Sequence, residues 1–309
     1  MANATILSLV QTTLQAMGVA TYGNPSTVIG NSNQDVTQTL ALINMSADAL
    51  AREHDWQAAT KQYIFSATYF TYTGDTTADS TSLTNMSSIV SLDTTFRAVG
   101  GSIPQDTLIN AAPAGTTVVL NQAATATATG VSITFSKTLF AVPSDFDRPI
   151  DNTNWDKSKH WIMLGPKTAQ EREWLRSGYI SAGPRIRWWF MGGYFQIWPP
   201  LGATESLSYE YQSKNWALVT AATTPVPTKQ SFTVDTDTCI FPDALMRAMI
   251  RLKYYEAKGF DTTAFYSGYR QQVDIAKASD AGGRTLSMAP RMGDILIGWG
   301  NIPDSGYGS

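Results

Sequence analysis

The sequence has few of the residues from which enzymes build metal and redox sites. Its 309 residues include two histidines, His54 and His160, and a single cysteine, Cys239. That set excludes an intramolecular disulfide and the usual ligand spacing of a zinc site. The sequence also lacks a phosphate-binding loop, a dinucleotide-binding fingerprint and a nucleophile elbow. We therefore predict a protein that is not an enzyme and that holds no metal ion and no cofactor.

Charge is scarce as well. Charged residues make up 15% of the chain and the net charge is −3, whereas an average soluble protein has about 25% charged residues. This balance does not indicate a basic surface for binding nucleic acid. No segment approaches the roughly 18 uninterrupted apolar residues of a membrane span, and Met1–Leu9 lacks the positive start of a signal peptide. We expect no contact with a membrane, and the lone cysteine favours assembly in a reducing compartment.

Aromatic residues are plentiful instead, with nine tryptophans and thirteen tyrosines. A chain with so little charge has little polar surface to keep large aromatic patches from associating. One interpretation is that part of this aromatic surface is buried against other subunits. The other is an aromatic-rich β core inside the chain. Composition alone leaves both open.

Residues 1–60 are predicted to form two helices. A short helix over 4–17 carries apolar residues on one face, and Gly18 is a suitable residue to end it. A longer helix over 34–54 can be capped by Asn33 or Ser32. Its apolar stripe recurs every three or four residues, at Val36, Leu40, Ile43, Ala47 and Leu50.

Residues 236–279 are predicted to form a second pair of helices. Pro242 suits the first turn of the first of these helices, and Gly259 suits its end. Asp261–Ala278 follows as the second helix, with one apolar face made by Phe265, Tyr269, Val273 and Ala276. Residues 280–309 are rich in glycine and scattered apolar residues, so they are predicted to form an extended arm that docks on a partner.

The middle of the chain changes to the two-residue period of β-strands. Residues 61–72 are predicted to form one strand rich in β-formers. Residues 73–137, rich in Thr, Ser, Ala, Val and Gly, are predicted to be a small β module inserted into the host domain, because aromatic strands resume after them. Short strands are expected at Ser87–Leu92, Thr116–Asn121 and Val131–Phe135. The alternative for this stretch is a long disordered loop.

The clearest β-hairpin signal lies at residues 185–198. Gly192 and Gly193 separate two aromatic strands, and a two-residue turn of this kind needs positive φ. Ser206–Gln212 alternates as a third strand. These strands are assigned to an antiparallel β domain over 61–72 and 138–235. The predicted fold class is therefore α+β: a helical bundle from the N- and C-terminal helix pairs, this β domain, the inserted module and the arm.

A few side chains remain as candidates for chemistry. Asp145 and Asp147 form a close carboxylate pair that could act in acid–base catalysis or hold a cation, although aspartates in such loops more often cap turns. His54 and His160 are isolated from other ligand-type residues. Cys239 lies in an apolar run and is predicted to be a buried, inert thiol.

The hairpin aromatics offer a second candidate site. Alternation places Trp188 and Phe190 on one face and Trp189 on the other. We predict that these rings pack against protein on both faces. Stacking on a sugar is the alternative.

Several short motifs follow one another along the chain: Ala16-Met17-Gly18-Val19, Leu40–Ala51, Asp55-Trp56, residues 142–149 (VPSDFDRP), Leu164-Gly165-Pro166, Ile197-Trp198-Pro199-Pro200 after the hairpin, and Tyr209-Glu210-Tyr211. In this arrangement the chain resembles the head-to-tail connector or adaptor family of short-tailed bacteriophages (podophages), also called tail tubular protein A. Residues 74–135 resemble a small β module common in phage virion proteins.

The resemblance implies a structural protein at the head–tail junction of the virion, assembled in the host cytoplasm. It implies a homo-oligomeric ring of about twelve copies that joins the portal protein to the tail nozzle, carries tail fibres in some cases, and lets genomic DNA pass without specific binding. The arm is expected to dock on the portal through Arg284, Met288, Arg291, Met292, Ile295, Ile297 and Trp299. The hairpin is expected to face the nozzle through Trp188, Trp189, Gly192, Gly193, Tyr194 and Trp198.

Three alternatives stay open. The first is a tail protein that binds a receptor or glycan through Trp188, Trp189 or the inserted module. The second is a wall hydrolase that uses Asp145 and Asp147. The third is a neck or stopper protein of a long-tailed phage.

Overall fold

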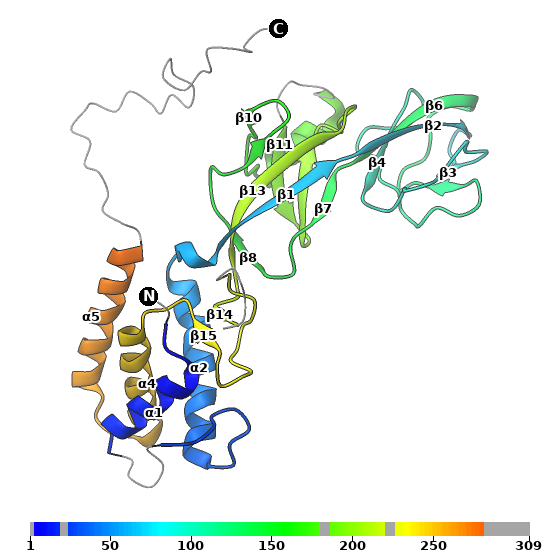
Figure 1. The fold of residues 1–309 in the computed structure, drawn as a ribbon. Coiled ribbons are helices and arrows are strands. Elements are labelled where there is room, and N and C mark those ends of the chain that lie inside the picture. The colour runs from blue at the N-terminus through cyan, green and yellow to red at the C-terminus, as the bar shows by residue number, and fades with distance from the viewer. Residues whose placement is uncertain (1–2, 19–23, 180–185, 220–225, 281–309) are drawn as a thin grey trace, which may run out of the picture.

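The computed structural model describes residues 3–18, 24–179, 186–219 and 226–280. The fold class is α+β, as predicted. Most of the helical residues gather at one end of an elongated molecule, and the antiparallel sheets extend from there to the other end (Figure 1). The chain starts in the helical part, leaves it to build the sheets, and returns to it for the last two helices.

Four helices make up the helical part. Asn33 caps the second of them by accepting a hydrogen bond from the backbone N–H of Asp35 at 2.8 Å, as expected of an N-cap asparagine. Gly259 ends the third helix with φ at 75°, in the left-handed region that favours glycine. Pro242 lies at the N-cap, one position before the predicted first turn. The helices are α1 (Ile6–Ala16), α2 (Gln34–Glu53), α4 (Asp243–Lys258) and α5 (Thr263–Asp280).

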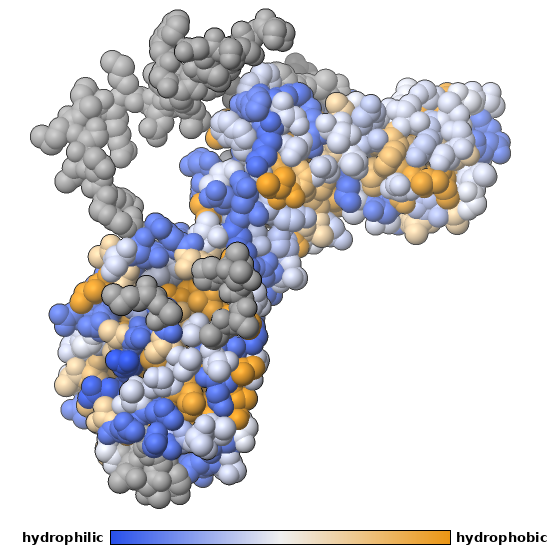
Figure 2. Space-filling view, viewed as in Figure 1, coloured by the Kyte–Doolittle hydropathy of each residue, from blue (hydrophilic) through white to orange (hydrophobic). Residues whose placement is uncertain are grey.

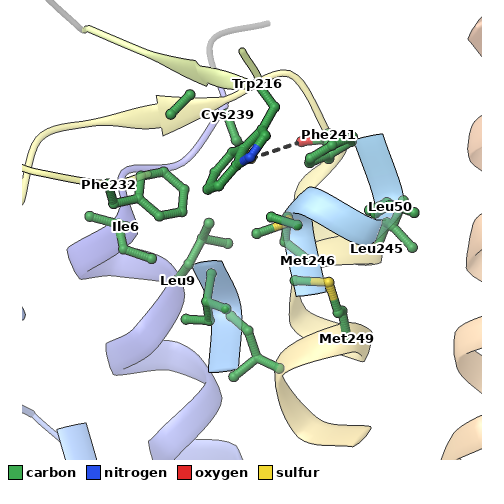
Figure 3. Packing of buried hydrophobic residues seen from close by; sticks show 14 of the residues in the cluster. Ile6, Leu9, Leu50, Trp216, Phe232, Cys239, Phe241, Leu245, Met246 and Met249 are labelled. Carbon is green, nitrogen blue, oxygen red and sulfur yellow. Dashed lines mark hydrogen bonds between the residues drawn. The ribbon is translucent and has the colours of Figure 1, made fainter. Parts of the chain in front are cut away.

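The core of the helical part lies between α1, α2 and α4 (Figure 3). Aromatic side chains from the chain around two short strands, β14 (Ala217–Leu218) and β15 (Thr238–Cys239), cover one end of it. Helix α5 packs on α4 and adds only Val273 and Ala276 as buried side chains. Buried residues from the other elements include Ile6, Leu9, Leu50, Trp216, Phe232, Phe241, Met246 and Met249.

Two antiparallel sheets form the host β domain and share one aromatic core. The first runs in the order β1-β13-β9-β10, and β8 also pairs with β13. The second runs β11-β12-β7. Phe65 and Tyr209 from the first sheet meet Phe140, Trp188 and Phe195 from the second. The strands are β1 (Thr60–Ala67), β7 (Leu139–Ala141), β8 (Phe146–Pro149), β9 (Trp155–Asp156), β10 (Trp161–Ile162), β11 (Arg187–Met191), β12 (Tyr194–Trp198) and β13 (Glu205–Ser213).

The single strand predicted over residues 61–72 is wrong. The structure contains two strands there, β1 and β2 (Tyr69–Thr76), separated at Thr68 and belonging to different sheets. In β1 the buried side chains are Phe65 and Ala67, whereas Phe70 and Tyr72 of β2 pack on the core of the inserted module. The alternation thus changes phase at Thr68, and residues before the predicted boundary at 73 already belong to the module's sheet.

The inserted module has its own hydrophobic core, so it is not a disordered loop. Its main sheet has the order β2-β6-β4, and a small sheet pairs β3 with β5. The strand predicted at Val131–Phe135 is confirmed within a longer one. The strand predicted at Thr116–Asn121 shrinks to two residues, and Ser87–Leu92 forms turns instead of a strand. The strands are β3 (Ser82–Leu83), β4 (Phe96–Val99), β5 (Val118–Val119) and β6 (Ala128–Lys137).

A short helical segment packs beside the hairpin. Helix α3 (Ala169–Trp174) begins with a capping box between Thr168 and Glu171. A π-helical turn, Leu175–Tyr179, follows it. The α-helix is therefore only six residues long, because the turn after it winds with a different hydrogen-bond pattern.

Candidate functional site

Three of the candidates for chemistry, Asp145, Asp147 and His54, make contacts within the chain. Among the described residues, no group of three or more His, Cys, Asp or Glu side chains is arranged to hold a metal ion. Asp145 and Asp147 were predicted to cap turns. In the structure both take part in ion pairs instead. The His54 ring lies edge-on to Trp56, and His160 lies in the loop between β9 and β10 with φ at 57°. Cys239 is fully buried, which raises the pKa of its thiol to about 12.

Asp145 is the centre of a polar cluster where the first sheet meets the helical part. Its carboxylate accepts hydrogen bonds from Lys61 Nζ at 2.6 Å, Ser213 Oγ at 2.8 Å and Tyr211 Oη at 2.9 Å. Burial alone would raise the pKa of Asp145, but these hydrogen bonds outweigh it and hold the pKa below its ordinary value. Lys61 also donates to the carbonyl oxygen of Pro227 at 3.0 Å. A charged carboxylate therefore ties β1 and β13 to the segment beside β14.

A second set of charged contacts lies on the other side of this junction. Arg148 of β8 donates to both Asp55, after α2, and the neighbouring Asp147, at 2.7 Å and 2.9 Å. It also donates to the carbonyl oxygen of His54 at 3.1 Å. Arg52 of α2 lies 3.5 Å from Asp147. We call these contacts, with the Asp145 cluster, the neck, because they connect the helical part to the sheets.

A buried arginine fastens the inserted module to the host β domain. Arg97 of β4 is 2% exposed, pairs with Asp106 and lies with its guanidinium 5.5 Å from the ring centre of Trp198 in β12. Arg176, after α3, reaches the same Asp106 at 3.6 Å. Burial, with repulsion from Arg176, lowers the pKa of Arg97 to about 10, so it stays charged at neutral pH. Leu201 N also donates to Ser136 Oγ at 2.8 Å across this joint. The sequence did not predict this joint, because nothing in the residues around Arg97 indicates that its side chain is buried.

The hairpin has the predicted geometry, with φ of 62° and 79° at Gly192 and Gly193. Its tryptophans are buried inside the chain: Trp188 packs in the aromatic core, and Trp189 and Trp198 pack against Leu175. Rings in this position cannot stack on a sugar or on a partner. The surface that the hairpin presents is therefore its tip, where Met191 and Tyr194 are 42% and 36% exposed.

Gly165, in one of the motifs behind the resemblance, allows Trp188 to reach this core. A Cβ atom at residue 165 would lie 2.5 Å from the carbonyl oxygen of Trp188. Any other residue would push the hairpin away from the chain segment before α3.

Among the described residues, the helical part exposes apolar side chains around α5. This 18-residue helix buries two side chains, and Tyr266 and Ile275 are 55% and 51% exposed. A groove of about 560 Å³ lies between α2, α4 and α5. A second groove, of about 470 Å³, lies between α4 and α5 and contains Arg247 and Arg251. On the face shown in Figure 2, apolar patches interrupt the polar surface of the helical part.

The arm predicted over residues 280–309 falls almost wholly outside the described residues, as do all seven of its candidate anchors. The described chain ends at Asp280, and this residue is held at the neck. Its carboxylate accepts a hydrogen bond from Gln57 N at 3.0 Å and lies 3.4 Å from His54 Nε2.

A comparison with models of protein families assigns the chain to a family. A family model described as SU10 adaptor protein matches residues 97–291, more than half of the chain. The chain belongs to the SU10 adaptor family. Membership makes this protein a bacteriophage adaptor, in agreement with the broader part of the predicted resemblance. No curated protein is similar enough to count as a match.

The match places the SU10 adaptor region from β4 through α5. It therefore includes the Arg97 joint, the hairpin and half of the helical part. Within the described residues, no helix is long and apolar enough to cross a membrane.

Proposed function

We propose that this SU10 adaptor is a structural, non-enzymatic protein that joins the portal to the tail nozzle of a short-tailed phage, as tail tubular protein A does. In this proposal about twelve copies form a ring through which DNA passes. The family match, taken with the uncovered surface around α5, carries the proposal. A helix that buries so little of itself gains its stability from packing on something else.

The helical part is proposed to act as one helical bundle that builds the ring wall. Helices from both ends of the chain already share a core, so the ring wall and the base of the arm belong to one unit. Residues 281–309 are proposed to leave this bundle and dock on the portal. Since Asp280 is fixed to Gln57 and His54, the arm starts from a defined point on the neck.

The β end is proposed to face the tail nozzle. The tip of the hairpin, Met191 to Tyr194, is the part of the predicted nozzle contact that is available at the surface. The Arg97 joint holds the inserted module against Trp198, and the module is proposed to meet fibres or the nozzle.

The experiment that tests this function is co-sedimentation of the full chain with the portal protein of its phage. We expect the chain to bind portal rings in several copies, and deletion of residues 282–309 to abolish binding while the thermal melt of the remaining chain is retained. Unchanged binding of the deletion variant would refute the role of the arm. A full chain that stays monomeric and ignores the portal would refute the adaptor role itself.

A separate assay addresses the enzyme alternative. We expect the purified chain to show no activity against bacterial cell walls in a zymogram, since Asp145 and Asp147 are tied up in ion pairs. Wall lysis that is lost in an Asp145→Asn variant would overturn the non-enzymatic assignment.

A further inference from the structure

We propose that residues 294–299, in the segment after α5, add a strand to the outer edge of β1 in the same chain. The inference goes beyond the proposed function, because it gives this segment a binding site that needs neither a portal nor a ring. The site is the edge of the first sheet, and the occupant is the part of the segment that best suits a strand.

β1 is an edge strand along its whole length. All eight of its residues pair with β13 on one side, and within the described residues no strand pairs with it on the other side. In an antiparallel pair, every second residue directs both its N–H and its C=O away from the partner strand. In the described part of the chain, no other segment forms backbone hydrogen bonds with these outward groups of β1. They are therefore available to a further strand.

This edge has none of the features that usually keep an edge strand from pairing. Natural edge strands carry proline, a β-bulge or an outward charge, or they are covered by another segment. The register of β1 with β13 is continuous from Thr60 to Ala67, and the strand contains no proline. Its one charged side chain, Lys61, is held by Asp145 at 2.6 Å. We therefore expect this edge to be covered in the working protein.

The exposed face of β1 offers an apolar neighbour to an added strand. Ile64, in the middle of β1, is 51% exposed, and Gln62 and Ser66 lie beside it on the same face. An isoleucine on an adjacent strand packs well against such a side chain, and pairs of this kind stabilise sheets. The added strand would thus bury Ile64 as well as pair its backbone.

The described chain ends beside the start of this edge. Asp280, the last residue of α5, accepts a hydrogen bond from Gln57 N at 3.0 Å, and β1 begins three residues later, at Thr60. From there β1 runs away from the helical part toward the inserted module (Figure 1). An extended stretch over residues 281–293 can span about 45 Å, whereas β1 is about 26 Å long. Residues 294–299 can therefore reach every position along the edge.

These six residues are the part of the segment with the clearest preference for β structure. Their sequence is DILIGW, and isoleucine and tryptophan are enriched in strands. Glycines and prolines interrupt the rest of residues 281–309. A segment attached by a short linker has an effective concentration of about 1 mM at its site, which favours the chain's own segment over that of a separate copy.

The pairing would also control when the arm is available. Ile295, Ile297 and Trp299 are among the expected portal anchors, and they cannot contact β1 and the portal at the same time. Docking on the portal would therefore displace the strand from β1. Until then, the pairing keeps the apolar residues of the arm and the edge of the sheet covered by each other.

Site-resolved amide hydrogen exchange on the full chain tests the pairing. We expect the β1 amides that point away from β13 to exchange at least about tenfold more slowly than in the double variant Leu296→Pro/Ile297→Pro. Adjacent prolines remove N–H groups from both edges of the added strand. The matched control Ser287→Pro/Met288→Pro makes the same change elsewhere in the segment and should keep the slow exchange. Amides that point toward β13 should stay slow in every variant, which shows that the sheet remains folded.

Three results would overturn the inference. Equal exchange of the outward β1 amides in the full chain and in the Leu296→Pro/Ile297→Pro variant means that residues 294–299 do not cover the edge. Equal loss of protection in the control variant means that the effect is not specific to them. Protection that disappears on about a hundredfold dilution means that the strand comes from another copy. The samples contain no portal protein, so these results are independent of the co-sedimentation that tests the adaptor role.

Discussion

Replacing Asp145 by alanine should weaken the neck by about 3 kcal/mol. Its side chain is 17% exposed and that of its partner Lys61 is 21% exposed, so water replaces little of what is lost. Breaking a buried ion pair costs about 3–5 kcal/mol, because it leaves a charge without a partner. Lys61 keeps its hydrogen bond to the carbonyl oxygen of Pro227, which places the expected loss at the lower end of that range.

Urea unfolding followed by tryptophan fluorescence measures this loss. The matched control is Asp55→Ala. The Asp55 side chain is 66% exposed and pairs with Arg148. Exposed pairs of this kind contribute about 0–1 kcal/mol. If the two variants unfold at the same urea midpoint, the Asp145 cluster does not hold the neck together and the reasoning fails.

The same carboxylate predicts a dependence on pH. Because the pKa of Asp145 is lower in the folded chain than its ordinary value of 3.8, folding is favoured by the ionised form. The contribution is fully present above the ordinary pKa and is lost as the pH falls through the lowered pKa. An Asp145→Asn variant should therefore show a smaller loss of stability than the unmodified chain between pH 5 and the acid limit of folding. Parallel pH profiles would contradict this.

Three further predictions concern single residues. Arg97→Ala should destabilise the joint to the module by about 3 kcal/mol in urea, because Asp106 loses its buried partner and keeps only Arg176, at 3.6 Å; an unchanged midpoint would remove Arg97 from the joint. Gly193→Val should cost about 1–2 kcal/mol, since φ of 79° is unfavourable for a branched side chain, whereas Met191→Val at the same tip serves as the control. Cys239 should resist thiol reagents at pH 8 until urea unfolds the chain, because its raised pKa leaves almost no thiolate; rapid labelling of the native chain would show that the site opens.

The helices and the hairpin could be predicted because their signals are local. The stripe from Val36 to Leu50 fixes the buried face of α2, and Asn33 marks its start. Gly192 and Gly193 fix the hairpin turn because both need positive φ. In each case the residues that decide the structure lie within a few positions of one another, so no knowledge of distant partners is needed.

The division of the predicted strand at Thr68 is hard to see in the sequence. Large side chains occupy both odd and even positions between residues 63 and 72, so the segment resembles one continuous aromatic strand. Only the partners show that Phe65 points into one core and Phe70 onto another. The neck and the Arg97 joint were beyond sequence reasoning for the same reason. Arg97 and Trp198, like Lys61 and Asp145, are brought together only by the fold.

The many aromatic residues led to two interpretations, a core inside the chain and a surface buried against other subunits. The structure supports each interpretation in a different part of the molecule. Of the eight tryptophans that the structure describes, five are buried within the chain, which supports the aromatic core for the sheets and for the end of the helical part: Trp56, Trp188, Trp189, Trp198 and Trp216. Uncovered apolar surface remains around α5 instead. Its predicted apolar face held four residues, of which the chain buries Val273 and Ala276 and leaves Phe265 and Tyr269 partly exposed. A helix whose apolar stripe is wider than the core that it contacts has surface left for a partner, and this mismatch locates the expected subunit contact better than aromatic content does.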